Sequence, residues 1–173
     1  MKERKGLIIE GIKNLNSSDK QQVLKINIEN NVKNGGQLHY AGILQHDFVV
    51  LAKIANKVVG YALLKSSFLA DDDLYVMQVA VDKNLQHLGI GSKLYEYAYK
   101  YSKGFPYLTA NVNEANGISQ GFHKKMGFRH CGYNNLGMIY VRPISKEVIN
   151  TLDDAKPESF DIELPNNYLE RVI

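Results

Sequence analysis

The chain has 173 residues, of which 45% are hydrophobic and 23% are charged, and its formal net charge is +3. This composition is typical of one soluble globular domain, and no apolar run is long enough to span a bilayer. The first residues lack the apolar core of a secretory signal, and a single cysteine, Cys131, excludes an internal disulfide and a cysteine metal cluster. We therefore expect a cytoplasmic protein that needs neither a membrane nor a metal.

The charge is unevenly distributed along the chain. Residues 1–142 contain 18 Lys and Arg against 11 Asp and Glu, a net charge of +7, whereas residues 143–173 contain 3 against 7, a net charge of −4. A basic body suits a polyanionic ligand, although surface composition alone can produce the same imbalance. No basic run is dense enough to indicate a nucleic-acid groove, so a nucleic-acid partner is not expected.

The first half of the chain is rich in strand patterns. Ser17, Ser18 and Asp19 offer an N-terminal cap for a helix, and the pair Asn56-Lys57 separates two β-rich runs as a hairpin turn does. In chain order, the patterns predict a strand over residues 7–12, a helix over 20–30, and strands over 48–55, 58–66 and 74–81.

The second half alternates helices with strands. Gly127 follows an apolar face of helical period, where glycine commonly ends a helix. The patterns predict a helix over residues 89–103, a strand over 107–113, a helix over 116–126, and strands over 128–133 and 138–142. The acidic residues after 142 favour a short helix near 145–152 and then an irregular arm, because Pro157 and Pro165 interrupt them. This order predicts a mixed α/β fold with a central sheet.

A glycine-containing turn joins the strand over residues 74–81 to the following helix. It carries Gln-x-x-Gly-x-Gly at Gln86, Gly89 and Gly91. Such a turn points several backbone N–H groups at one spot before a helix, and this arrangement binds phosphate. The dinucleotide fingerprint and the P-loop are absent, because the third glycine of the first and the Gly-Lys-Ser/Thr of the second are missing. Alone, the turn also fits a purely structural strand-to-helix connection.

A second motif begins about two dozen residues after Gly91. The pattern N-x-x-A-x-x-F-Y-x-x-x-G-F is matched by Asn116, Ser119 (for Ala), Phe122, His123 (for Tyr), Gly127 and Phe128. Together with the turn, which matches the motif Q/R-x-x-G-x-G/A, and with the order of elements over residues 7–142, the chain resembles the GNAT superfamily of N-acetyltransferases.

The resemblance implies a fold, a reaction and a co-substrate. The fold is a twisted, mostly antiparallel sheet of about seven strands flanked by helices, in an acyl-CoA-dependent domain over residues 1–142; residues 143–173 form an acidic C-terminal extension outside the resemblance. Acetyl-CoA is the implied co-substrate, and the acceptor is a primary amine of a small molecule or peptide that attacks directly in a ternary complex. A homodimer is common in this family and is a further expectation.

The resemblance also assigns residues to the cofactor. The backbone of Val79 and Val81 would pair with the pantetheine arm. Asn116, Phe122 and Lys125 would contact the cofactor, although a helix cap, a core ring and a solvated lysine are the corresponding structural alternatives. The backbone of the turn would hold the pyrophosphate through Gln86, His87, Leu88, Gly89, Ile90, Gly91 and Ser92.

Two residues are candidates for catalysis, His123 and Glu114. His123 stands where the family has a tyrosine, whose phenol with a pKa of about 10 donates a proton to the leaving thiolate. A neutral imidazole keeps one N–H for this purpose, or could accept a proton from the amine, and the structural alternative is an exposed helix residue. His123→Ala is then expected to lower kcat without changing acetyl-CoA binding, with Tyr75, Tyr133 and Tyr140 as the next candidates. Glu114 is a candidate general base, with Asp71–Asp73 and ordered water as the alternatives.

The acceptor itself is not specified by the sequence. Residues 21–45 and the last hairpin would shape its cleft, with His39, Tyr40 and His46 as candidate lining residues. Two other functions stay open: a non-catalytic acyl-CoA-binding module, and a toxin-like acetyltransferase that acts on aminoacyl-tRNA.

Overall fold

The computed structural model describes residues 4–31, 45–165 and 168. The strands of this part of the chain are β1 (Arg4–Ile12), β2 (Phe48–Ile54), β3 (Lys57–Ser66), β4 (Leu74–Val81), β5 (Tyr107–Val112), β6 (Arg129–Asn134), β7 (Gly137–Pro143) and β8 (Glu158–Glu163). Its helices are α1 (Ser17–Asn31), α3 (Ile90–Lys100), α4 (Gly117–Lys125) and the 3-10 helix η2 (Leu152–Asp154). None of these helices has the length and apolarity that crossing a membrane requires.

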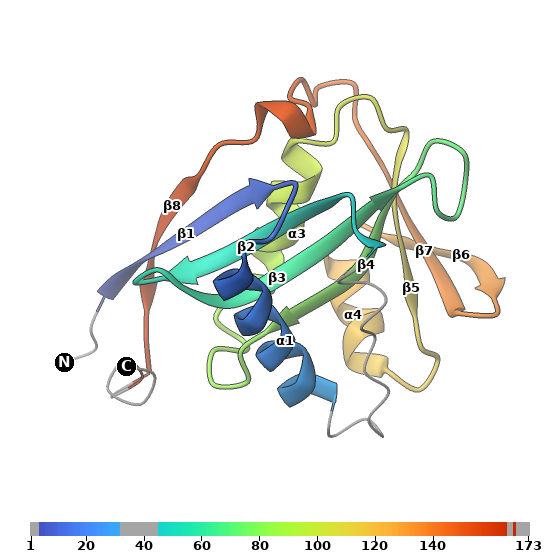
Figure 1. Ribbon diagram of the computed structural model, residues 1–173. Helices are drawn as coiled ribbons and strands as arrows, with labels where there is room; N and C mark the ends of the chain where they lie inside the picture. The colour runs from blue at the N-terminus through green and yellow to red at the C-terminus, as the bar shows by residue number, and fades with distance from the viewer. Residues whose placement is uncertain (1–3, 32–44, 166–167, 169–173) are drawn as a thin grey trace.

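The described strands form one sheet in the order β6-β7-β5-β4-β3-β2-β1-β8 (Figure 1). All neighbours are antiparallel except β4 and β5, which run parallel. The predicted mixed α/β fold with a mostly antiparallel sheet is confirmed. The eighth strand comes from the C-terminal extension, which was not expected to contribute one.

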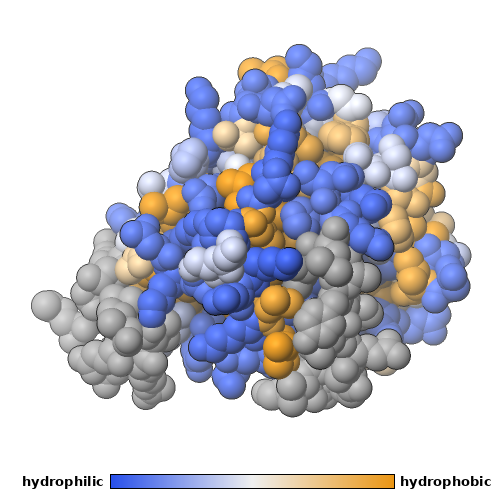
Figure 2. All heavy atoms as spheres, viewed as in Figure 1, coloured by the Kyte–Doolittle hydropathy of each residue, from blue (hydrophilic) through white to orange (hydrophobic). Residues whose placement is uncertain are grey.

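The sheet separates two apolar cores. Strand β2 is apolar throughout because it is covered on both faces: Phe48 and Val50 point to the α3 side, and Val49 and Leu51 to the α1 side. Helix α1 buries one face against the smaller core, and Figure 2 shows the molecular surface on this side as mostly hydrophilic. The larger core holds α3 and leads to the cleft described below.

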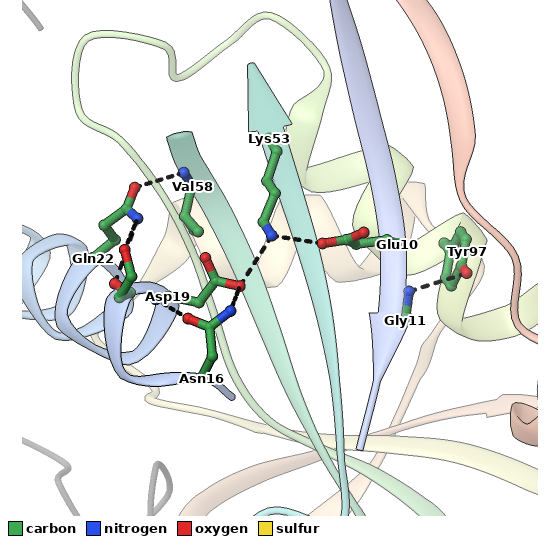
Figure 3. A network of polar contacts seen from close by, with 9 residues as sticks. Glu10, Gly11, Asn16, Asp19, Gln22, Lys53, Val58 and Tyr97 are labelled. Atoms are coloured by element: carbon green, nitrogen blue, oxygen red, sulfur yellow. Dashed lines mark hydrogen bonds and ion pairs between the residues drawn. The ribbon is translucent and has the colours of Figure 1, made fainter. Parts of the chain in front are cut away.

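Helix α1 is fixed at its N-terminus by a polar network (Figure 3). The Asp19 N–H donates to Asn16 Oδ1 at 2.8 Å, so Asn16 is the capping residue and the helix begins earlier than predicted. The Asp19 carboxylate accepts from Lys53 Nζ at 2.9 Å, and the same ammonium is 2.7 Å from Glu10 Oε1. The network therefore joins α1 to β1 and β2.

The C-terminal extension differs most from the prediction. Instead of the predicted helix near residues 145–152, the chain makes a turn and then the short η2, which begins at Leu152. Strand β8 then pairs antiparallel with β1 from Arg4↔Glu163 to Ile9↔Glu158. Phe160 and Ile162 alternate with polar residues and pack against the larger core. This period of two is a strand signal that the flanking prolines obscured. The domain boundary at residue 142 stays a prediction.

Candidate active site

A cleft of about 520 Å³ opens beside the end of β4. Strands β4 and β5 pair only from Leu74↔Leu108 to Val76↔Ala110 and then separate (Figure 1). The cleft brings together all the predicted cofactor residues except Leu88: Val79, Val81, Gln86, His87, Gly89, Ile90, Gly91, Ser92, Asn116, Phe122 and Lys125. His123 and Glu114, the two predicted catalytic residues, do not line it.

The edge of β4 presents backbone groups to this cleft. The Asp82 N–H donates to the Val59 carbonyl on β3 at 2.8 Å, and Ala80 is paired with Tyr61. Because antiparallel strands alternate the direction of their peptide groups, those of Val79 and Val81 face away from β3. An extended, amide-bearing ligand can pair with them as an added strand does.

The turn before α3 leaves the first backbone N–H groups of the helix without an acceptor inside the helix. His87 and Gly89 adopt left-handed conformations, with φ of 67° and 84°, and Gly89 is an N-cap without a side-chain hydrogen bond to the helix. The first α-helical bond of α3 runs from the Lys93 N–H to the Gly89 carbonyl, so the amides of Ile90, Gly91 and Ser92 have no acceptor within the helix. These donors and the helix dipole make the spot favourable for an anion.

The turn is held by side chains from distant segments. Asn30, near the end of α1, donates to the Val81 carbonyl at 3.1 Å and accepts from Gln86 Nε2 at 2.9 Å. Tyr168 donates to Asp82 Oδ2 at 3.0 Å. Sequence reasoning missed Asn30, Asp82 and Tyr168, because no local motif marks a residue that acts through a contact more than 50 residues away.

Helix α4 forms the opposite wall of the cleft. Asn116 caps it, since its Oδ1 accepts from the Ser119 N–H at 3.0 Å. The Phe122 ring lines the cleft and meets the Tyr95 ring edge-on, with centroids 5.3 Å apart. Asn116 thus has the expected capping role and also lies on the cleft surface.

His123 is buried behind this wall, with 4% of its surface exposed. Its Nδ1 lies 2.7 Å from the Ser119 carbonyl oxygen, which can only accept, so Nδ1 carries the proton. Its Nε2 lies 2.6 Å from the Tyr95 hydroxyl and therefore accepts from it. Burial lowers the pKa of His123, so the ring is neutral and both its nitrogens are engaged. The alternative of an exposed helix residue is wrong.

Glu114 lies in the exposed connection between β5 and α4, where its carbonyl accepts from Gln120 Nε2 at 2.8 Å.

A second polar contact, between Tyr75 and Asn111, lies close to the point where β4 and β5 separate. The Tyr75 hydroxyl on β4 donates to Asn111 Oδ1 on β5 at 3.0 Å, and Asn111 Nδ2 donates to Asn134 Oδ1 at 2.9 Å. Burial, and next the charge of Asp73, raise the pKa of Tyr75 to about 12.

The remaining expectations concern the acceptor and metals. His39 and Tyr40 lie outside the described residues, and His46 lies just before β2. Within the part of the chain that the structure describes, no three His, Cys, Asp or Glu side chains gather closely enough to hold a metal ion.

Comparison with known proteins bears on the family and the fold. Residues 19–128 match the acetyltransferase (GNAT) family. The peptidyl-lysine N-acetyltransferase YjaB of Salmonella typhimurium is 39% identical over 85 residues, which cover 47% of this chain and 52% of that protein. The protein of the same name from Escherichia coli is 36% identical over 85 residues, 47% of this chain and 51% of that protein. The chain spans about half the length of the curated relatives it matches.

Solved structures share the fold at low sequence identity. An acetyltransferase from Thermus thermophilus superposes with a TM-score of 0.65 at 18% identity, covering 78% of this chain and 96% of that chain. The PaiA N-acetyltransferase from Thermoplasma acidophilum, crystallised with coenzyme A, gives 0.61 at 17% identity, covering 78% and 98%.

Proposed function

The chain belongs to the acetyltransferase (GNAT) family, and on that premise we propose that it transfers an acetyl group from acetyl-CoA to a primary amine. One observation carries the proposal: the uncapped start of α3 and the open edge of β4 face the same cleft. An anion-binding helix start beside a strand edge matches a molecule with a pyrophosphate and an amide-bearing arm.

Different residues of the cleft would contact different parts of the cofactor. The amides of Ile90, Gly91 and Ser92 would receive the pyrophosphate, and each favourable charge near a helix start contributes about 0.3–1 kcal/mol when exposed. The peptide groups of Val79 and the N–H of Val81 would pair with the pantetheine amides, whereas the Val81 carbonyl already accepts from Asn30 and Gln86. Phe122 would cover the arm from the α4 side, and Lys125, which lines the same cleft, would approach the phosphates.

The chemistry needs a neutral amine and a proton for the leaving thiolate. Deprotonating an alkyl amine with a pKa of about 10 at neutral pH costs about 4 kcal/mol. Glu114 stays the candidate base and, being outside the cleft lining, would act through water. For the thiolate we favour the Tyr75 phenol over His123, although neither residue lines the cleft. Tyr75 donates to Asn111, just beyond the last β4–β5 pair, and its pKa of about 12 keeps it protonated.

For the acceptor we propose the side-chain amine of a lysine in a peptide, attacking the thioester directly in a ternary complex. The support is the name of the two curated relatives, which are peptidyl-lysine N-acetyltransferases. The cytoplasmic location and the homodimer stay predictions.

A thiol-release assay with acetyl-CoA tests this function. The acceptor panel contains lysine peptides, free amino acids, polyamines and aminoglycosides, and release is expected with the peptides. Tight acetyl-CoA binding without release for any amine would instead indicate a non-catalytic binding module. Release only with aminoacyl-tRNA, at a rate that falls steeply with salt, would indicate an RNA-directed enzyme.

A further inference from the structure

We propose that Tyr168 is a positioning residue through which the C-terminal extension sets the affinity of the α3 turn for the pyrophosphate of acyl-CoA. The inference rests on the proposed function, because it assumes that this turn receives the cofactor. Residue 168 lies outside the family match over residues 19–128. The extension would thus act on the turn without contacting the ligand.

Asp82 is the point at which the extension meets the turn. Its N–H donates to the Val59 carbonyl on β3, and its own carbonyl accepts from the Leu85 N–H, both at 2.8 Å. Its Oδ1 accepts from the Asn84 N–H at 2.8 Å, which closes the first bend of the turn. Its Oδ2 accepts from the Tyr168 hydroxyl at 3.0 Å. The Tyr168 bond therefore joins this bend to a segment remote in sequence.

Tyr168 is itself firmly placed. Only 4% of its surface is exposed, and it belongs to the same core as Leu85 and Ile90, which bracket the turn. The pairing of β8 with β1 and the buried Leu164 lead the chain to this position. Burial, and next the charge of Asp82, raise the pKa of Tyr168, so its hydroxyl keeps the proton that it donates.

The turn needs such an anchor because its conformation is not intrinsically favoured. His87 holds a left-handed φ of 67°, and the side chains from Gln86 to Leu88 are exposed rather than packed. If only a fraction of molecules have the amides of α3 converging on one spot, the apparent affinity falls by that fraction. A phenol bonded to Asp82 raises the fraction without touching the ligand.

The test compares Tyr168→Phe with the matched variant Tyr101→Phe in the full chain. Tyr101 also bonds a carboxylate of the extension, from its hydroxyl to Glu158 Oε1 at 3.4 Å, and is likewise buried, but it does not contact the turn. Calorimetric titration with CoA is expected to show about a fivefold weaker Kd for Tyr168→Phe, which corresponds to about 1 kcal/mol, and no change for Tyr101→Phe. The kcat at saturating acetyl-CoA stays unchanged in both.

A second donor separates positioning from a general effect on the fold. For acetyl-pantetheine, which lacks the pyrophosphate, kcat/KM is expected to be equal in Tyr168→Phe and the unmodified protein. Equal losses for both donors, or a lowered Tm with an unchanged Kd for CoA, would overturn the inference. If the unmodified protein fails to bind CoA at all, the proposed function fails, and this inference falls with it.

Discussion

The two helices that border the cleft begin in opposite ways. Helix α3 follows a left-handed Gly89 with no side-chain cap, and its first amides have no acceptor within the helix. Helix α4 follows Asn116, whose side chain accepts from the Ser119 N–H, and one turn later His123 satisfies both its nitrogens inside the protein. The start of α3 has donors available for a ligand, whereas the polar groups of α4 already stabilise the fold.

This contrast suggests where catalysis should not be sought. A motif residue in α4 can match the family pattern and still be occupied by internal hydrogen bonds, as His123 is. If the contrast holds, substitution of the buried His123 in α4 changes mainly the free energy of unfolding, and substitutions at the start of α3 change mainly affinity.

The largest expected effect is on stability, for His123→Ala. Removing a buried ring and leaving the Tyr95 hydroxyl without its partner should lower the free energy of unfolding by about 3 kcal/mol. CoA affinity should stay within about twofold, since a buried group outside the cleft lining contributes little to it. Urea denaturation and calorimetric titration check both. A variant of intact stability whose kcat collapses would break the contrast and place His123 in catalysis, as the sequence alone suggested.

The next effect is on affinity, for Gly91→Val. A Cβ built on Gly91 would lie 3.7 Å from the Phe122 ring and 4.0 Å from Val81, so one methyl fits but the two further methyls of valine would crowd these cleft-lining side chains. We expect acetyl-CoA affinity to fall about a hundredfold, or about 2.7 kcal/mol. Gly121→Val on α4 is the matched control, because nothing lies within 4 Å of its Cβ. Equal affinities for the two variants would remove the start of α3 from the binding site.

A smaller effect concerns pH. Burial lowers the pKa of His123 in the folded state below its unfolded value of about 6.5, so the unfolded chain binds more protons as the pH falls below that value. The free energy of unfolding is then highest above pH 6.5 and declines on acidification, by at most about 1.4 kcal/mol per pH unit from this group. Urea melts between pH 7.5 and 5 should lose this slope in His123→Gln and keep it in His87→Asn, an exposed control.

The smallest effect is expected at the cap of α4. Asn116→Ala should lower the free energy of unfolding by about 1 kcal/mol, and Asn116→Ser should restore most of it because serine also caps. Calorimetric titration of the Asn116→Ser variant with CoA then separates the capping role of Asn116 from a cofactor contact. If its affinity recovers along with stability, Asn116 acts as a cap; if only stability recovers, Asn116 also contacts the cofactor.

The residues that line the cleft could be predicted from sequence because their determinants are local. The turn from Gln86 to Ser92 and the pattern from Asn116 to Phe128 each act within one strand-to-helix or helix segment. The environment of His123 could not be predicted, since its partner Tyr95 lies 28 residues away on another helix. The roles of Asn30 and Tyr168 could not be predicted for the same reason. The bond from Asn30 to the Val81 carbonyl spans 51 residues, and the bond from Tyr168 to Asp82 spans 86 residues.

The fold shows the same difference between local patterns, which could be predicted, and long-range contacts, which could not. Apolar periodicity placed most strands and helices up to β7 within a few residues, because they have a buried face. Strand β6 has no buried residue, and the turn signal at residues 134–137 placed it instead. The cap of α1 was misplaced by a competing run of Ser17, Ser18 and Asp19, of which Asp19 instead pairs with Lys53. Strand β8 was missed because its alternation is short and its partner β1 is the most distant in sequence.

The pairing of β8 with β1 has a consequence for how the protein is made. Ile9 faces Glu158, so during synthesis the outer edge of β1 has no partner until about 150 further residues are made, or roughly 7–30 s at ordinary translation rates. An unpaired edge strand is a template for association with other chains. The nascent protein therefore carries an exposed edge until β8 has been synthesised, and a chaperone that shields residues 4–12 during that interval should raise the yield of folded protein.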